Sequence, residues 1–214
     1  KVGAKKAEIV ALYDIKREKA EALAKSAGLA NAVICRSLPA LLASEVDAVI
    51  LATPNSCHYP QTLAALKAGK HVLVEKPMAG SVAEADKMIA LAASRGLVLQ
   101  VNQSLRFSAL YAEISKRVRA GAIGRPLRAR CLRAASSSPD VGWSPGATWF
   151  VQKRYGGSLV GDIAVHMADF LQCAFGPVAR VHAVNRRWSH EVTDNVTAIF
   201  DFANGATGVL ELSW

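Results

Sequence analysis

The sequence lacks any long apolar run and any pairing pattern among its cysteines. No stretch approaches the roughly 18 to 20 apolar residues that a membrane span requires, and residues 1–6 have no signal-peptide character. The four cysteines are widely spaced, without a CxxC pair and without His or Cys at metal-ligand spacing (Cys35, Cys57, Cys131 and Cys173). We therefore expect no membrane association, no bound metal and a cytoplasmic location. An exported form stays open, because a signal peptide would precede Lys1.

A nucleic-acid-binding signature is also missing, although the chain is strongly basic. Lys and Arg total 26 against 17 Asp and Glu, which gives a net charge of +9 and raises the question of an anionic partner. The basic residues are scattered, and no interleaved aromatic residues or zinc-finger spacing accompany them. The one local cluster comprises Arg125, Arg128, Arg130 and Arg133. We expect no nucleic-acid partner.

Short apolar segments alternate with helical periodicity through the first hundred residues. With 51% hydrophobic residues, the 214-residue chain can bury a core and hold one large or two small domains. Strands are predicted at 7–13, 46–53, 71–75 and 97–101, covered on both faces, with a weaker one at 32–35. Helices are predicted at 16–27, 60–68 and 82–95, each followed by glycine. This order predicts a doubly wound parallel sheet of the Rossmann type.

The second half has a different pattern. A helix at 110–120 and a strand at 127–134 precede a loop rich in Ser, Pro and Gly, a long apolar helix at 159–175, and strands at 178–188, 192–202 and 205–214. Asn204-Gly205 is a favoured hairpin turn. We predict an α/β domain over 1–104 and an α+β domain with a mainly antiparallel open sheet over 105–214.

Polar residues follow each predicted parallel strand, where ligands of such sheets bind. They are Asp14, residues 53–55, residues 75–77 and residues 102–103. An acid at the position of Asp14 can accept hydrogen bonds from a ribose, which favours NAD, whereas Lys16 and Arg17 could hold the 2′-phosphate of NADP. Asp14 could equally cap the following helix, and the two roles are compatible.

The glycine loop that binds a dinucleotide's phosphates is absent. Its glycines usually lie about 20 residues before the ribose-binding acid, but only thirteen residues precede Asp14, and Gly3 stands alone. We therefore expect the sheet to lack its first strand, and this chain to bind a dinucleotide weakly.

The long apolar helix carries a polar stripe, which indicates a cavity or a partner. Asp162 and His166 are four residues apart, so their side chains should be neighbours, and a carboxylate beside an imidazole suits acid-base catalysis. The alternative is a buried pair that only satisfies itself. Lys76 could be a solvated lysine or, between Glu75 and Pro77, a rigidly held one. The full stripe is Ser158, Asp162, His166, Asp169 and Gln172.

Three segments resemble one known family. DAVILATPNSCHYPQTLAALKAGKHVLVEKPMAGSVAEA, at residues 47–85, is similar in order and spacing to the Gfo/Idh/MocA oxidoreductases. The similarity continues through VNQSLRF at 101–107 and GGSLVGDIAVHMADF at 156–170, then through the closing strands. It covers nearly the whole chain, whereas the relatives have a phosphate loop and continue beyond the position of Trp214. Both ends therefore look truncated, and the chain as written is expected to be a stable but inactive piece.

The resemblance implies a site for hydride transfer between a sugar or polyol hydroxyl carbon and NAD, with NADP possible. His166 would take the hydroxyl proton, Lys76 would hydrogen-bond the same oxygen, and Asp162 would orient the imidazole. The peptide bond between Lys76 and Pro77 would be cis. Asp14 would bind the ribose. Arg106 and Trp149 would lie on the substrate side, or else only pack. Residues that would line the nicotinamide are Thr53, Asn55, His58, Glu75, Lys76, Asn102 and Gln103.

The resemblance also implies a homo-oligomer, a dimer or tetramer, because the open sheet face commonly forms the interface in relatives. Two other functions remain open within the same fold. One is a sugar or dinucleotide sensor without turnover, which would not need Lys76, Asp162 and His166 together. The other is an NAD-dependent glycosidase, which would show no net change in NADH.

Overall fold

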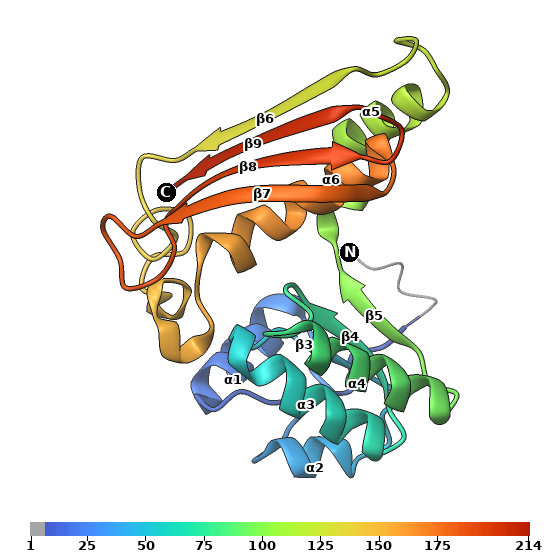
Figure 1. The fold of residues 1–214 in the computed structure, drawn as a ribbon. Coiled ribbons are helices and arrows are strands. Elements are labelled where there is room, and N and C mark those ends of the chain that lie inside the picture. Colours follow the sequence, from blue (N-terminus) through green and yellow to red (C-terminus); the bar gives the residue numbers. More distant parts are fainter. Residues whose placement is uncertain (1–6) are drawn as a thin grey trace.

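Strands and helices alternate through the first half of the computed structural model, which describes residues 7–214 (Figure 1). All strand pairings in this half are parallel, which confirms the predicted α/β fold. Gly3 and the other residues of 1–6 lie outside the described part. The elements are β1 (Ala11–Leu12), α1 (Arg17–Ala27), β2 (Val33–Ile34), α2 (Leu38–Leu42), β3 (Ala48–Leu51), α3 (Asn55–Lys67), β4 (His71–Glu75), α4 (Val82–Ser94) and β5 (Leu99–Asn102).

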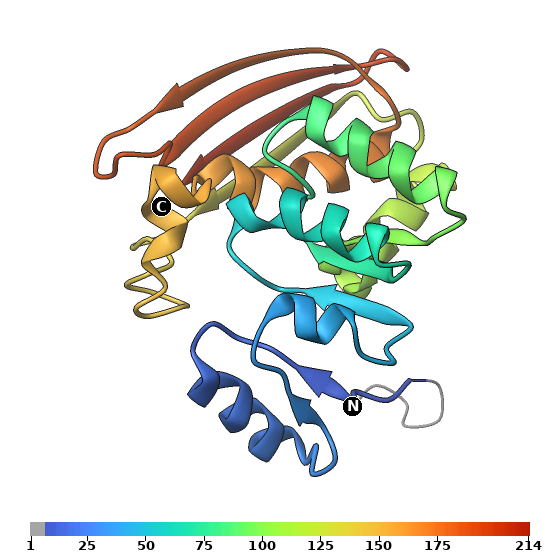
Figure 2. The same cartoon turned by 90° about the horizontal axis from the view of Figure 1, so that it is seen from below.

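The parallel strands lie in two sheets with a gap between them, β1-β2 and β3-β4-β5 (Figure 2). No strand within residues 7–214 lies between β1 and β3 to join the two sheets. This arrangement agrees with the prediction of a sheet without its first strand. The separation has a further consequence. Ile50 in β3 is 66% exposed, so β3 is buried on only one face and not on both as predicted. The second face is open because α1 lies with the small sheet (Figure 2).

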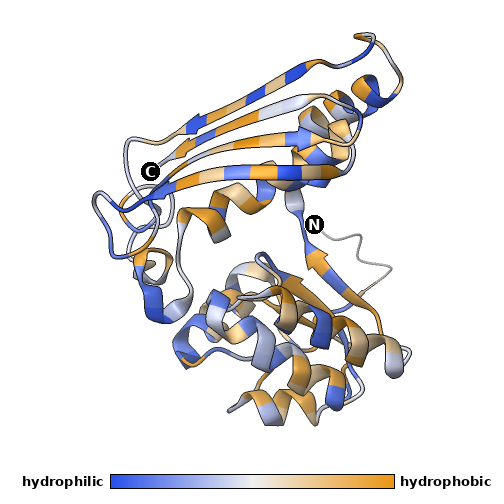
Figure 3. Cartoon of the chain, in the orientation of Figure 1, coloured by the Kyte–Doolittle hydropathy of each residue, from blue (hydrophilic) through white to orange (hydrophobic). Residues whose placement is uncertain are grey.

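The core of the first half lies between the β3-β4-β5 sheet and helices α3 and α4. Alternate residues of β3 and β4 are buried, as the period of two in a strand requires. Hydrophobic residues are frequent along these strands and the helices that cover them (Figure 3). Met88 of α4 and Leu66 of α3 are fully buried against them. Helix α3 begins at Asn55, directly after Pro54, and not at residue 60 as predicted. Pro60 lies inside it, where a proline removes one main-chain hydrogen bond without ending the helix.

The second half is a four-stranded sheet of order β6-β9-β8-β7, with α5 and α6 on one face (Figure 1). The β7-β8 and β8-β9 pairs are antiparallel and β6-β9 is parallel, which confirms the predicted mainly antiparallel sheet. The boundary at residue 104 stays a prediction. The elements are η1 (Ser104–Phe107), α5 (Ala109–Arg119), β6 (Arg128–Ala134), η2 (Thr148–Val151), η3 (Lys153–Tyr155), η4 (Val160–Ala164), α6 (Val165–Phe175), β7 (Val178–Arg186), β8 (Asn195–Phe202) and β9 (Thr207–Ser213).

The predicted helix at 159–175 is not regular. Its first turns, η4, are π-helical, and α6 continues from Val165. A π-helical turn holds more residues than an α-helical one and often occurs at functional sites. It therefore changes the angular relation between residues before and after Val165. No helix among residues 7–214 is long and apolar enough to cross a membrane.

A buried carboxylate organises the loop between β7 and β8. Asp194 is 4% exposed and accepts hydrogen bonds from the main-chain N–H groups of Trp188, Ser189 and His190, and from His190 Nδ1 at 3.2 Å. Burial by itself raises the pKa of Asp194, but these hydrogen bonds outweigh it, so the pKa lies below its usual value. The loop in turn supports the start of η4, because Thr193 O accepts from Leu159 N at 2.8 Å.

We predict that Asp194→Asn lowers the free energy of unfolding at pH 7 by about 1–3 kcal/mol, because buried N–H groups lose a charged acceptor. Since the folded-state pKa is depressed, the carboxylate stabilises the fold above its unfolded pKa and loses that effect as the pH falls through the folded pKa. The variant should therefore lose less stability between pH 6 and acid than the wild type. Denaturant unfolding at several pH values measures both effects.

Asp201→Asn is the matched control, because Asp201 is half-exposed and lies 3.7 Å from an exposed Arg180. It should change the free energy of unfolding by less than about 0.5 kcal/mol. Equal losses in the two variants would contradict the assigned role of Asp194.

Candidate active site

Lys76 directly follows β4, and its side chain contacts the second half of the chain. Its Nζ donates hydrogen bonds to Asp162 Oδ1 at 2.6 Å and to Asp162 O at 2.9 Å. The side chains are 14% and 3% exposed, so this is a buried ion pair between residues 86 positions apart. The Lys76–Pro77 peptide bond is cis, as the resemblance implied.

Asp162 has one carboxylate oxygen free. Oδ1 accepts from Lys76, whereas Oδ2 is buried and has no hydrogen-bond partner within residues 7–214. Buried polar atoms are nearly always paired in folded proteins, and an exception calls for an explanation. A carboxylate oxygen can only accept, so the group that would satisfy it is a donor, such as a hydroxyl.

His166 lies beside this pair and is held by Gln103. It is 9% exposed, and its Nδ1 lies 2.9 Å from Gln103 Oε1. Because an amide oxygen accepts, Nδ1 carries the proton, and Nε2 of the neutral ring presents its lone pair. His166 Nδ1 therefore donates to Gln103, and not to Asp162, which the resemblance implied would orient the ring. Asp162 lies within the π-helical turn, which alters the regular helical spacing that the prediction assumed.

The surroundings of His166 favour the neutral ring. Burial lowers the pKa of His166 below its ordinary value of 6.5, and the positive charge of Lys76 lowers it further. The negative charge of Asp162 opposes this shift, and the charge of Arg133 adds to it. A neutral imidazole with a free Nε2 can accept a proton at neutral pH.

The ends of the parallel strands meet at the same edge as Lys76. Asn102, the last residue of β5, donates from Nδ2 to Glu75 Oε1 at 2.5 Å. Thr53, which follows β3, donates to Gln61 Oε1 at 2.7 Å, and Asn55 donates from Nδ2 to Gly156 O at 3.0 Å. These residues lie at the carboxyl ends of β3, β4 and β5, at the same edge as Lys76, and their contact with a nicotinamide stays a prediction.

His58 lies between the residues that follow β3 and β4. It is fully buried, with Nδ1 2.7 Å from Pro77 O and Nε2 2.8 Å from Thr53 O. Both ring nitrogens are thus engaged by main-chain carbonyls of the β3 and β4 exits. This geometry makes His58 a link that holds the turn behind Lys76. Its place on the nicotinamide side of a cofactor stays a prediction.

Asp14 lies at the end of β1, apart from the Lys76 cluster. Its Oδ1 accepts from Lys16 N at 2.8 Å, in the turn before α1. The N-cap residue of α1 is Lys16, without a side-chain cap, so Asp14 does not cap the helix as the alternative expected. Oδ2 has no hydrogen-bond partner within the described chain, so a second role remains compatible. Binding of a ribose by Asp14 stays a prediction.

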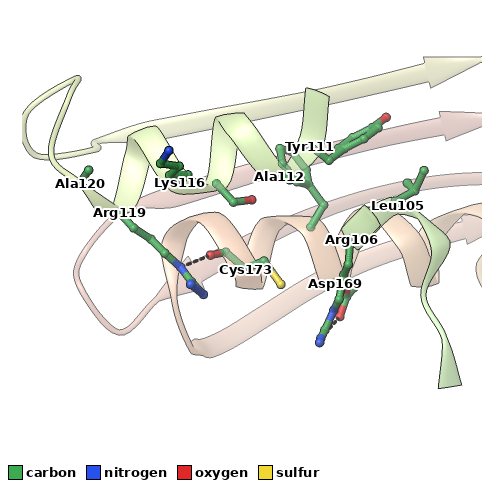
Figure 4. A pocket seen from close by; sticks show the side chains of 11 residues that line it. Leu105, Arg106, Tyr111, Ala112, Lys116, Arg119, Ala120, Asp169 and Cys173 are labelled. Carbon is green, nitrogen blue, oxygen red and sulfur yellow. Dashed lines mark hydrogen bonds and ion pairs between the residues drawn. The ribbon is translucent and has the colours of Figure 1, made fainter. Parts of the chain in front are cut away.

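Arg106 lines a pocket of about 490 Å³ between η1, α5 and α6 (Figure 4). Its Nε and Nη2 donate to the two oxygens of Asp169 at 2.8 and 2.6 Å, which raises the pKa of the guanidinium. Lys76 and His166 are not among the lining residues. The structure therefore shows Arg106 joining η1 to α6, and a contact with substrate stays a prediction.

Trp149 lies in η2, where its ring stacks on Phe150 with centroids 3.6 Å apart. Its substrate contact also stays a prediction. Sequence reasoning missed Gly157, where a Cβ atom would overlap the carbonyl oxygens of Trp149 and Phe150. The Gly-Gly pair just before the polar stripe was the available signal. It also missed the link between Gln103 and His166, which no local pattern could indicate.

Comparison with known proteins places both halves in one family. The model described as "Oxidoreductase family, NAD-binding Rossmann fold" matches residues 2–103, and the model "GFO/IDH/MocA C-terminal domain" matches residues 111–214. A 1,5-anhydro-D-fructose reductase from Ensifer adhaerens is 36% identical over 167 residues, covering 77% of this chain and 48% of the relative. The chain spans about half the length of the curated relatives it matches.

Solved structures show the same similarity. A levoglucosan dehydrogenase in complex with NADH and levoglucosan superposes with a TM-score of 0.82 at 30% identity, over 95% of this chain and 57% of that one. GenD2 from gentamicin A biosynthesis, in complex with NAD, gives a TM-score of 0.86 at 27% identity, over 97% and 58%.

We predict strong coupling between Lys76 and Asp162. Asp162→Asn leaves a buried ammonium without a counter-charge and should lower the free energy of unfolding by about 3–5 kcal/mol, and Lys76→Met should cost a similar amount. The double variant removes both charges, so its loss should be smaller than the sum by at least about 1 kcal/mol. Denaturant unfolding of all four proteins measures this difference, and additive losses would show that no buried ion pair exists.

Proposed function

Because the chain belongs to the Gfo/Idh/MocA family of oxidoreductases, we propose that the protein transfers a hydride between a hydroxyl-bearing carbon of a sugar or polyol and a nicotinamide cofactor. The observation that carries this proposal is the buried Lys76-Asp162 ion pair with a neutral His166 beside it. The names of the relatives, a reductase of an anhydro sugar and a dehydrogenase of levoglucosan, support the substrate class.

The residues present fit the nicotinamide side of such a cofactor. Polar groups gather at the carboxyl ends of β3, β4 and β5, where nucleotides bind in parallel sheets. Asp14 keeps one carboxylate oxygen free for a ribose hydroxyl, which favours NAD, while Lys16 and Arg17 leave NADP open. When bound, the nicotinamide supplies the hydride chemistry.

The chain's own residues handle the proton and the charge on oxygen. In oxidation, His166 Nε2 takes the proton of the substrate hydroxyl, while Nδ1 stays bonded to Gln103. An ammonium group has three N–H donors. Lys76 uses two on Asp162, so the third is available to the same substrate oxygen, where it stabilises the negative charge that develops. Asp162 thereby orients Lys76, and its free Oδ2 accepts from a second hydroxyl.

The partners and the compartment belong to the same proposal. The outer face of the second sheet carries exposed apolar side chains, Leu132, Val184 and Ile199, which suits association of copies of the protein. All four cysteines are free thiols, in keeping with a reducing cytoplasm. The small-molecule partner is the sugar or polyol itself.

We predict that, in a protein extended by a glycine-rich first strand and a carboxyl-terminal segment, Lys76→Ala and His166→Ala each lower kcat by about 10²- to 10⁴-fold while NADH binding persists. Absorbance of reduced nicotinamide with a panel of sugars and polyols follows turnover, and calorimetry follows cofactor binding. Gln172→Ala, an exposed residue of α6, is the control and should keep full activity. Unchanged turnover in both active-site variants would refute the assigned roles.

We predict an acid limb in the pH dependence of substrate oxidation that lies below pH 6.5. The base form of His166 exists above its pKa, and that pKa is lowered by burial and by Lys76, so activity should be lost only as the pH falls through the lowered value. Gln103→Glu places a carboxylate beside His166 Nδ1, which favours the imidazolium and raises the pKa of His166. The acid limb of the activity profile should therefore move to higher pH. An unmoved limb would mean that another group titrates.

A further inference from the structure

Arg133 lies on the inner face of the second sheet, toward α6. Alternate residues of a strand share a face, so Ala129, Cys131 and Arg133 of β6 point the same way. Cys131 Sγ lies 3.3 Å from Met167 Sδ of α6, which identifies that face as the inner one. The register agrees, because Arg133 is paired with Leu212, whose side chain is buried in the core under the sheet.

Arg130 of the same strand lies on the opposite, outer face of the sheet. Its Nε donates to Glu211 Oε2 there. Arg128 lies on that face as well, two residues earlier. Of the three arginines of β6, Arg133 is the one on the face toward the helix that carries His166.

The strand places Arg133 two residues beyond Cys131, whose thiol contacts Met167, the residue after His166 on α6. His166 precedes Met167 on α6, and the positive charge of Arg133 is one of the charges that lower the pKa of His166. The two other cations of this region have carboxylate partners, since Lys76 pairs with Asp162 and Arg106 with Asp169. Arg133 forms no ion pair with any residue of 7–214, and it is exposed.

An arginine without a carboxylate partner has a specific chemical use. Its planar fork of N–H groups matches the two oxygens of a carboxylate or phosphate, and the guanidinium stays charged at every physiological pH. We propose that Arg133 binds an anionic group of the substrate, so that the protein acts on acidic sugars, those that carry a carboxylate or a phosphate, in preference to neutral ones. This inference rests on the proposed function, because it concerns the substrate of the same site.

The test measures binding and turnover separately, with D-glucose, D-glucuronate and D-glucose 6-phosphate as probes. Calorimetry in the presence of NADH gives the affinity for each probe, and nicotinamide absorbance gives kcat/KM where turnover occurs. The variants are Arg133→Gln, which removes the charge, and Arg133→Lys, which keeps it. Arg128→Gln is the matched control, because it removes an arginine from the same strand on the opposite face.

We expect the wild type to bind at least one of the two acidic probes about tenfold or more tightly than glucose. Arg133→Gln should abolish that preference without changing the affinity for glucose, Arg133→Lys should restore part of it, and Arg128→Gln should leave it intact. A preference for glucuronate identifies a carboxylate, and one for glucose 6-phosphate identifies a phosphate. Equal affinity for all three probes, or a preference that survives Arg133→Gln, overturns the inference.

The two levels of the proposal can fail independently. Turnover of glucose that requires Lys76 and His166, without any effect of Arg133→Gln on the choice of probe, would leave the oxidoreductase function intact and refute the role of Arg133. Binding of an acidic probe that depends on Arg133, without turnover of any probe, would support the role of Arg133 and count against hydride transfer.

Discussion

The arrangement of the site depends on one buried ion pair, between Lys76 at the end of a parallel strand and Asp162 on the second sheet's helix. A charged side chain that is withdrawn from water must have a partner with good geometry. The pair therefore holds the residue that follows β4 against the π-helical turn η4. Further polar contacts join the same elements, from Asn55 to Gly156 and from Gln103 to His166. The reacting groups are consequently held from both sides.

The same pair sets the electrostatics of the site. The ammonium of Lys76 disfavours a second positive charge on His166, and burial acts in the same direction. The imidazole is thereby kept as a base while the lysine remains a donor. In the proposed mechanism these two residues take opposite roles, since His166 accepts a proton and Lys76 stabilises an oxygen anion. The proposal assigns the free oxygen of Asp162 and the guanidinium of Arg133 to other groups of the substrate.

Periodicity predicted most of the fold, whereas contacts between distant residues limited what could be said of the site. Strand β4 was predicted at its observed bounds because a buried apolar run followed by Glu-Lys-Pro has clear ends. The stripe on the long helix was found for the same reason. The hydrogen-bond partner of His166 on that stripe was not predicted, because Gln103 meets His166 only through tertiary packing, which no window of sequence records.

Transfer of a deuterium label tests the central claim most directly. A polyol or sugar that the protein oxidises would carry deuterium on the carbon of the reacting hydroxyl, and the reduced nicotinamide would be isolated and examined by mass spectrometry. Hydride transfer predicts that the deuterium moves to the cofactor, because the hydrogen never exchanges with water, while the hydroxyl proton leaves through His166. Deuterium that remains in the product or appears in solvent would contradict the account.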